Sequence, residues 1–180
     1  MTDSPEPEVT ERAAKFLANK MTPRSRRVDH LTYSLWMISS IPAARHDESD
    51  FLTYACMVDA FFVHVRLLAE FLVRRTPKVD FGPNDVVHSW VAPESSAAQR
   101  LSQHWALASR HVVHFSRERV PESLDDLKAI ELDTATLRTM ANDVLAVMSA
   151  FVVTAEKQKI EHADRLRSEY DEALQRLVAD

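Results

Sequence analysis

The sequence predicts an all-α fold, a single-domain bundle of five to seven helices. The first sign is a shortage of glycine, because Gly82 is the only glycine in 180 residues. β-Hairpins and tight βα turns rely on glycine for backbone conformations with positive φ. The second sign is helical periodicity, since two long segments repeat apolar residues at alternating steps of three and four. We therefore expect neither a β-rich nor a Rossmann-like fold, and no glycine-rich phosphate-binding loop.

Prolines bound the first predicted helices. Residues 6–20 can form a short amphipathic helix, and Pro23 begins a second helix that Pro42 ends. We expect each helix to pack its apolar side against the rest of the bundle. The inward-facing residues of the second helix are Val28, Leu31, Leu35 and Ile38.

Two long helices, residues 47–75 and 94–117, are expected to form the centre of the bundle. Both are long enough to lie side by side as antiparallel neighbours. The first carries an apolar seam made of Phe51, Tyr54, Val58, Phe61, Val65, Leu68 and Leu72. The second carries a seam made of Ala98, Leu101, Trp105, Ala108, Val112 and Phe115.

The connection between these helices, residues 76–93, is long but is expected to pack onto the bundle. Gly82 to Asp85 forms a turn signal within it. The apolar side chains that favour packing are Phe81, Val86, Val87, Trp90 and Val91.

The last third of the chain is expected to supply a central helix and a charged one. Residues 121–132 can form one short helix, and a helix that begins at Asp133 or Thr134 has apolar residues on two sides. We expect residues 1–155 to form the bundle and residues 156–180 to form a charged helix or helical extension, not a separate domain. This last helix either protrudes to mediate oligomerisation or lies half-exposed on its own bundle.

Composition excludes several classes of protein. The net charge is −5, so the chain has no global attraction for nucleic acid, and an RNA site would need a local basic patch. We expect no DNA binding. Cys56 is the only cysteine, which excludes an intramolecular disulfide, and its apolar helix suggests a small core residue. The chain contains no run of about 18 apolar residues, so we expect no membrane span. We expect a cytoplasmic protein without a bound cofactor.

Three histidines of the second long helix are the main candidates for chemistry. His104, His111 and His114 share a side of this helix, next to its apolar seam. Such a group can bind a metal, bind phosphate or transfer protons, and it can also form a solvated helix surface. If the two long helices lie side by side, His64 of the first helix is expected to share a polar pocket with His104 and His111.

Two segments carry polar motifs within apolar helices. Residues 58–72 contain the pattern of apolar residue, His64, small residue and Arg66, and residues 109–119 contain His111, His114, Ser116 and Arg119. Together these segments resemble a family of uncharacterised, mostly bacterial, HEPN-like helical proteins. The resemblance covers roughly residues 30–155. It implies a helical bundle that is often dimeric, in a superfamily that includes RNA-cleaving toxins and defence proteins.

The sequence departs from the nuclease pattern of that superfamily. Those nucleases carry an arginine, four to six intervening residues and a histidine on a late helix. Here Arg100 and His104 have three residues between them, as do Arg110 and His114. We therefore predict an interaction module with a polar pocket or binding surface. The resemblance places His64, Arg66, Ser116 and Arg119 there, and the helix pattern adds His104. This module would be a homodimer that contacts RNA or a partner protein.

Two alternatives remain open. The first is a metal-independent ribonuclease, a toxin or defence protein, in which His111 or His114 transfers protons and Arg110 stabilises the phosphate. The second is a metal-binding bundle. No Glu-x-x-His pattern of the kind found in di-iron bundles is present, so we assign no metal ligands.

Overall fold

The computed structural model describes residues 23–44, 51–74, 81–113 and 134–178, and these ranges contain five α-helices and one short 3₁₀ helix. No strand occurs in these ranges, and the all-α prediction is confirmed. The predicted helices at residues 6–20 and 121–132 lie outside the described residues. In chain order the elements are α2 (Pro23–Ala43), α3 (Phe51–Val73), η1 (Pro83–Asp85), α4 (Ser96–Val113), α6 (Thr134–Lys157) and α7 (Ala163–Val178).

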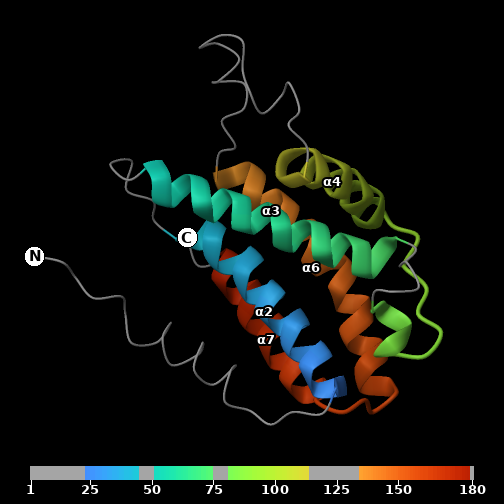
Figure 1. The fold of residues 1–180 in the computed structure, drawn as a ribbon. Helices are drawn as coiled ribbons and strands as arrows, with labels where there is room; N and C mark the ends of the chain where they lie inside the picture. Colours follow the sequence, from blue (N-terminus) through green and yellow to red (C-terminus); the bar gives the residue numbers. More distant parts are fainter. Residues whose placement is uncertain (1–22, 45–50, 75–80, 114–133, 179–180) are drawn as a thin grey trace, which may run out of the picture.

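Helices α3 and α4 lie side by side and run in opposite directions (Figure 1). Their direct contacts show the orientation, because Arg66 bonds to Ser109 and Glu70 bonds to Trp105. The residue number thus falls on α4 as it rises on α3. The predicted seam of α3 is buried at Val58, Phe61, Val65, Leu68 and Leu72.

Helix α6 occupies the centre of the bundle. It packs against α2, α3, α4 and α7, and its buried residues lie on more than one side, as its two apolar stripes predicted. They are Leu137, Met140, Ala141, Asp143, Val144, Leu145, Val147, Met148, Phe151, Val152 and Ala155. By length and composition alone α6 could also cross a membrane, but the core helix of a bundle has the same properties.

The chain turns sharply after Lys157, the last residue of α6, so residues 158–178 do not continue that helix. The N–H of Ile160 donates to the carbonyl of Ala155 at 3.1 Å, and the N–H of Lys159 donates to that of Glu156 at 3.0 Å. This pair of bonds is a Schellman motif, which requires a left-handed residue at the position of Lys159. Lys159 indeed has a φ of 51°.

Helix α7 then packs on its own bundle, along α2 and α6. It runs parallel to α2, because Arg165 pairs with Asp29 and Arg176 donates to Ser39 further along both helices. Of the two alternatives for the C-terminal segment, the structure shows the packed one. The apolar stripe that would have served an oligomer is buried at Leu166, Tyr170, Ala173 and Leu177.

We predict that Lys159→Gly stabilises the protein by about 1 kcal/mol. A left-handed conformation costs a residue with a Cβ roughly 1–2 kcal/mol, and glycine gives back part of that gain through unfolded-state entropy. Urea denaturation measures the change. The control is Lys157→Gly, two residues earlier inside the last turn of α6, which should cost up to about 1 kcal/mol. Equal destabilisation by both substitutions would contradict the role assigned to this turn.

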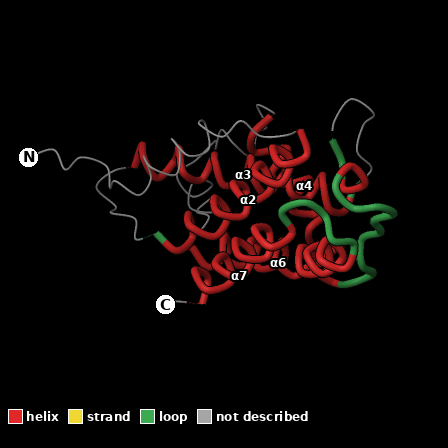
Figure 2. The backbone as a smooth tube through the Cα atoms, turned by 90° about the horizontal axis from the view of Figure 1, so that it is seen from below, coloured by secondary structure: helices red, strands yellow, loops and turns green. Residues whose placement is uncertain are grey.

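The described part of the connection between α3 and α4, residues 81–95, packs onto one end of the bundle (Figure 2). Val87 is fully buried, and the indole N–H of Trp90 donates to the carbonyl of Leu72 at 2.9 Å. The turn expected at Gly82 forms η1, closed by a bond from the Gly82 N–H to the Asp85 carboxylate at 2.8 Å. The expectation for Val91 was wrong, because 80% of this residue is exposed.

The prediction for Cys56 was also wrong. It was expected in the core, but it is exposed on α3. At 100° per residue, Cys56 lies about 140° from the buried Phe61. The apolar composition of α3 therefore extends to its solvent-facing side, where burial does not explain it.

Candidate functional site

The most strongly coupled polar cluster joins α4 to α6 around Asp143. This carboxylate is buried within the central helix. Arg100 binds this carboxylate through two nitrogens. Its Nε donates to Oδ1 at 3.1 Å and to Oδ2 at 2.9 Å, and its Nη2 donates to Oδ1 at 2.6 Å. His104 Nε2 lies 2.9 Å from the second oxygen. Arg100 and His104 are one helical turn apart on α4, so both reach the same partner.

The electrostatics of this cluster keep Asp143 ionised. Burial alone would raise the pKa of its carboxyl, but the hydrogen bonds and positive charge of Arg100 and His104 outweigh burial and lower this pKa. An ionised carboxylate only accepts hydrogen bonds, so Nε2 of His104 must carry a proton. In the neutral ring, Nδ1 of His104 is then the acceptor. The arrangement fixes one tautomer of this histidine.

The sequence analysis did not single out Asp143, although a signal was present. Asp143 lies between the buried residues Met140, Ala141 and Val144 on a helix that is apolar on two sides. A lone carboxylate in such a setting needs a cationic or hydrogen-bonding partner. Arg100 and His104, one turn apart on the neighbouring helix, were the matching pair.

A second polar row links α3 to α4. Arg66 Nε donates to Ser109 Oγ at 3.1 Å, and Arg66 Nη2 lies 3.7 Å from Oε2 of Glu70. The same oxygen accepts the indole N–H of Trp105 at 3.3 Å. Arg74 lies over the Trp105 ring at 3.7 Å from its centroid. The predicted binding residue Arg66 thus faces α4, where it holds the two helices in register.

His64 does not share a pocket with His104, and this expectation was wrong. His64 Nδ1 forms a hydrogen bond of 3.1 Å with Ser34 Oγ, and its ring meets Tyr33 edge-on, both on α2. Burial lowers the pKa of His64, which favours the neutral ring. The reason for the error is geometric. Arg66 faces α4, and His64, two residues away, lies about 200° around α3 from it.

The other predicted site residues fall mostly outside what the structure describes. Arg110 is exposed on α4. His111 belongs to α4, but its side chain is not among those described, and His114, Ser116 and Arg119 lie outside the described residues. Among the residues that the structure describes, no group of three or more His, Cys, Asp or Glu side chains could hold a metal ion.

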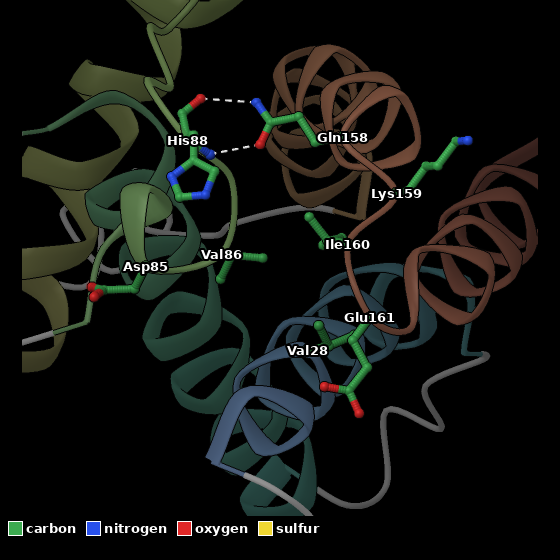
Figure 3. Close-up of a pocket in the computed structure, with 8 residues that line it drawn as sticks. All are labelled: Val28, Asp85, Val86, His88, Gln158, Lys159, Ile160 and Glu161. Carbon is green, nitrogen blue, oxygen red and sulfur yellow. Dashed lines mark hydrogen bonds between the residues drawn. The ribbon is translucent and has the colours of Figure 1, made fainter.

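A small pocket lies where the α6–α7 turn meets η1 (Figure 3). Gln158 closes one side, because its side chain bonds to both the N–H and the carbonyl of His88, at 2.7 and 2.9 Å. The volume of about 160 Å³ is below the roughly 300–1,000 Å³ of typical small-molecule sites. Lys159 and Asp85 point away from its centre in Figure 3. The full lining is Val28, Asp85, Val86, His88, Gln158, Lys159, Ile160 and Glu161.

Comparison with known proteins gives no relative: no family model matches the chain, and no curated protein or solved structure is significantly similar to it.

Proposed function

We propose that this chain is a helical interaction module that binds RNA through the outward side of α4. The observation that carries the proposal is the charge of this helix. Among the α-helices that the structure describes, α4 alone has no Asp or Glu, and it carries Arg100, Arg110 and two histidines. The chain as a whole has a net charge of −5, so α4 is a local departure from its acidic composition.

Arginines surround this helix on its exposed sides. Arg66 and Arg74 lie along its α3 edge, Arg100 lies along its α6 edge, and Arg110 is exposed on α4 itself. We call these four residues the arginine face. Arg100 and Arg110 are ten residues apart, about 15 Å along the helix, which spans more than one phosphate of an RNA strand. Glu70 and Asp143 pair with Arg66 and Arg100 and neutralise part of this charge.

A face of this kind recognises the phosphate backbone more than the bases. Arginine forms paired hydrogen bonds with phosphate oxygens, and each neutralised phosphate releases counterions. Affinity should therefore fall steeply with salt and depend weakly on sequence. Trp105 is occupied by Arg74 and Glu70, so base stacking on this indole would require that contact to open. The HEPN-like resemblance supports the same class of ligand.

Replacing Arg110 by glutamine should weaken RNA binding about 3- to 10-fold at low salt, as expected when one phosphate contact is lost, and should reduce the salt slope by about one phosphate. Fluorescence anisotropy with a labelled single-stranded RNA measures both quantities. Arg26→Gln is the matched control, because Arg26 is exposed on α2, away from the arginine face. The proposal fails if the wild-type chain does not bind at low salt, or if both variants lose affinity equally.

The ribonuclease alternative was predicted at His111 or His114 with Arg110, and one observation favours it at a different pair. Arg100 and His104 lie together against Asp143, which orients the imidazole. The same binding samples distinguish the two functions when RNA length is followed on a gel in the presence of EDTA. Intact RNA supports binding alone. RNA that the wild type shortens, and that stays intact with His104→Ala, His111→Ala or His114→Ala, would instead establish the nuclease.

A further inference from the structure

Arg100, His104 and Asp143 form a cluster in which two basic side chains share one carboxylate, and we call it the Asp143 cluster. Oδ2 of Asp143 lies 2.9 Å from both Nε of Arg100 and Nε2 of His104. When the imidazole is neutral, the charge of Asp143 cancels that of Arg100. When the imidazole is protonated, two positive charges face one negative charge, and the cluster carries a net charge of +1. One proton on His104 therefore decides whether this cluster is neutral or positive.

Nδ1 of His104 is the atom that takes up this proton. Nε2 already carries the hydrogen that it donates to the ionised Asp143. In the described part of the chain no group forms a hydrogen bond with Nδ1, and the imidazole is 16% exposed. Nδ1 is also not fully buried, because the one fully buried side-chain N or O atom without a hydrogen bond among the described residues is Oδ1 of Asp29. Solvent can therefore protonate His104 while its bond to Asp143 stays in place.

Among the described residues, Asp143 and Arg100 are the charged groups that face the imidazole of His104. Helix α4 packs against α3 and α6. On α6, Arg138 instead donates to the carbonyl of Pro42. On α4 itself, Arg110 and His111 lie about 9 to 10 Å further along the helix axis. The charged side chains at the facing end of α3 contact Ser109 and Trp105, on another flank of α4, and they are Arg66, Glu70 and Arg74.

The other two members of the cluster keep their charge near neutral pH. Burial would raise the pKa of the Asp143 carboxyl, but the hydrogen bonds and charges of Arg100 and His104 lower this pKa overall. The guanidinium of an arginine stays protonated in proteins. Histidine side chains change charge between about pH 5 and 8. Within the Asp143 cluster, the imidazole is therefore the group whose charge responds to pH in this range.

Arg100 presents the charge of the cluster to solvent. Helix α4 lies at the edge of the bundle (Figure 1), and the Arg100 side chain is 48% exposed. Asp143 occupies Nε and Nη2 of the guanidinium, so Nη1 remains available to a ligand. A phosphate oxygen that accepts from Nη1 is attracted by any positive charge that the carboxylate leaves uncancelled. Phosphate should therefore bind Arg100 weakly beside a neutral imidazole and more strongly beside a protonated one.

We propose that His104 couples RNA binding to the uptake of a proton, because protonation of its Nδ1 frees the charge of Arg100 for a phosphate of the RNA. The coupling is reciprocal, so bound RNA also favours the protonated imidazole. His104 acts through Asp143 and Arg100 and sets the strength of a phosphate contact that another residue makes. This inference rests on the proposed RNA binding and names its regulation: the arginine face holds RNA more tightly in mild acid than in mild base.

The ratio of RNA affinities at about pH 5.5 and about pH 8 tests this coupling. Fluorescence anisotropy at constant low salt measures it with labelled oligouridine, whose bases do not titrate in this range. Wild type should bind about 3- to 10-fold more tightly at the lower pH, as expected for the gain of one phosphate contact. His104→Gln should lose most of this ratio, because the glutamine amide can donate to Asp143 but takes up no proton. His30→Gln is the matched control and should keep the ratio, since His30 is an exposed histidine of α2, which packs mainly against α3 and α7.

Calorimetry of the wild type gives a second measurement, which decides the question if His104→Gln does not fold. Titration with oligouridine near neutral pH, in two buffers of different ionisation enthalpy, counts the protons taken up with the RNA, and we expect net uptake. A wild type that binds no RNA at either pH contradicts the proposed function itself. Binding without proton uptake, an affinity ratio that His104→Gln retains, or one that His30→Gln loses equally would overturn the proton coupling and leave RNA binding standing.

Discussion

Replacing Phe151 by alanine should destabilise the protein by about 3–5 kcal/mol, the usual cost of deleting a fully buried aromatic side chain. Phe151 is 0% exposed on the central helix. Its ring packs edge-on against Phe71 at 5.1 Å and against Trp90 at 5.2 Å between centroids. One side chain therefore joins α6, α3 and the α3–α4 connection. Its loss should leave a cavity that rigid neighbouring helices fill only in part.

Urea denaturation followed by circular dichroism measures this change. Phe81→Ala is the matched control, because Phe81 belongs to the same aromatic group, 5.5 Å from Phe71, but is 37% exposed. We expect it to cost about 1 kcal/mol. If Phe151→Ala costs no more than Phe81→Ala, the aromatic group does not hold the connection to the bundle as the structure indicates.

Sequence patterns predicted this fold well where a local rule determines the outcome. Pro23 begins α2 and the two-sided apolar pattern of α6 corresponds to its central position, because both depend only on neighbouring residues. The predicted burial of Cys56 and Val91 was wrong because apolar residues also occur on protein surfaces. Burial depends on which side of the element another helix occupies, and periodicity does not specify that.

The candidate site was less predictable for the same reason. The pairing of helices 47–75 and 94–117 suggested that His64 would meet His104. The structure instead places α2 on the His64 side of α3 and α4 on the Arg66 side. A rotation of one helix by less than half a turn changes the partners of every flank residue. His104 remained at an interhelical polar site, but its partner came from α6.

The position of Asp143 also connects stability to the proposed binding face. Arg100 is half-exposed while its guanidinium grips a buried carboxylate. The same side chain therefore contributes to the α4–α6 interface and to the charge of the arginine face. This dual role explains why Arg110, and not Arg100, is the informative substitution for RNA binding. Changing Arg100 would alter folding and ligand contact together.

Asp143→Asn should destabilise the protein by about 2–3 kcal/mol at neutral pH. Loss of one partner of a buried ion pair costs roughly 3–5 kcal/mol when the remaining charge stays buried. The cost is smaller here because Arg100 is 48% exposed and can turn to solvent. The matched control is Asp171→Asn, an exposed carboxylate paired with Arg167 on α7, which should cost less than about 1 kcal/mol.

The pH dependence of this difference tests its electrostatic origin. Burial would raise the pKa of Asp143, but Arg100 and His104 lower it overall, below the unfolded value of about 3.9. A carboxyl whose pKa is lower in the folded state stabilises the fold above the unfolded pKa. This contribution is lost as the pH falls through the folded pKa. The gap in unfolding free energy between wild type and Asp143→Asn that comes from this carboxyl should therefore close in acid. A gap that persists below both pKa values would mean that asparagine disrupts packing at this position, and that the ion pair contributes little.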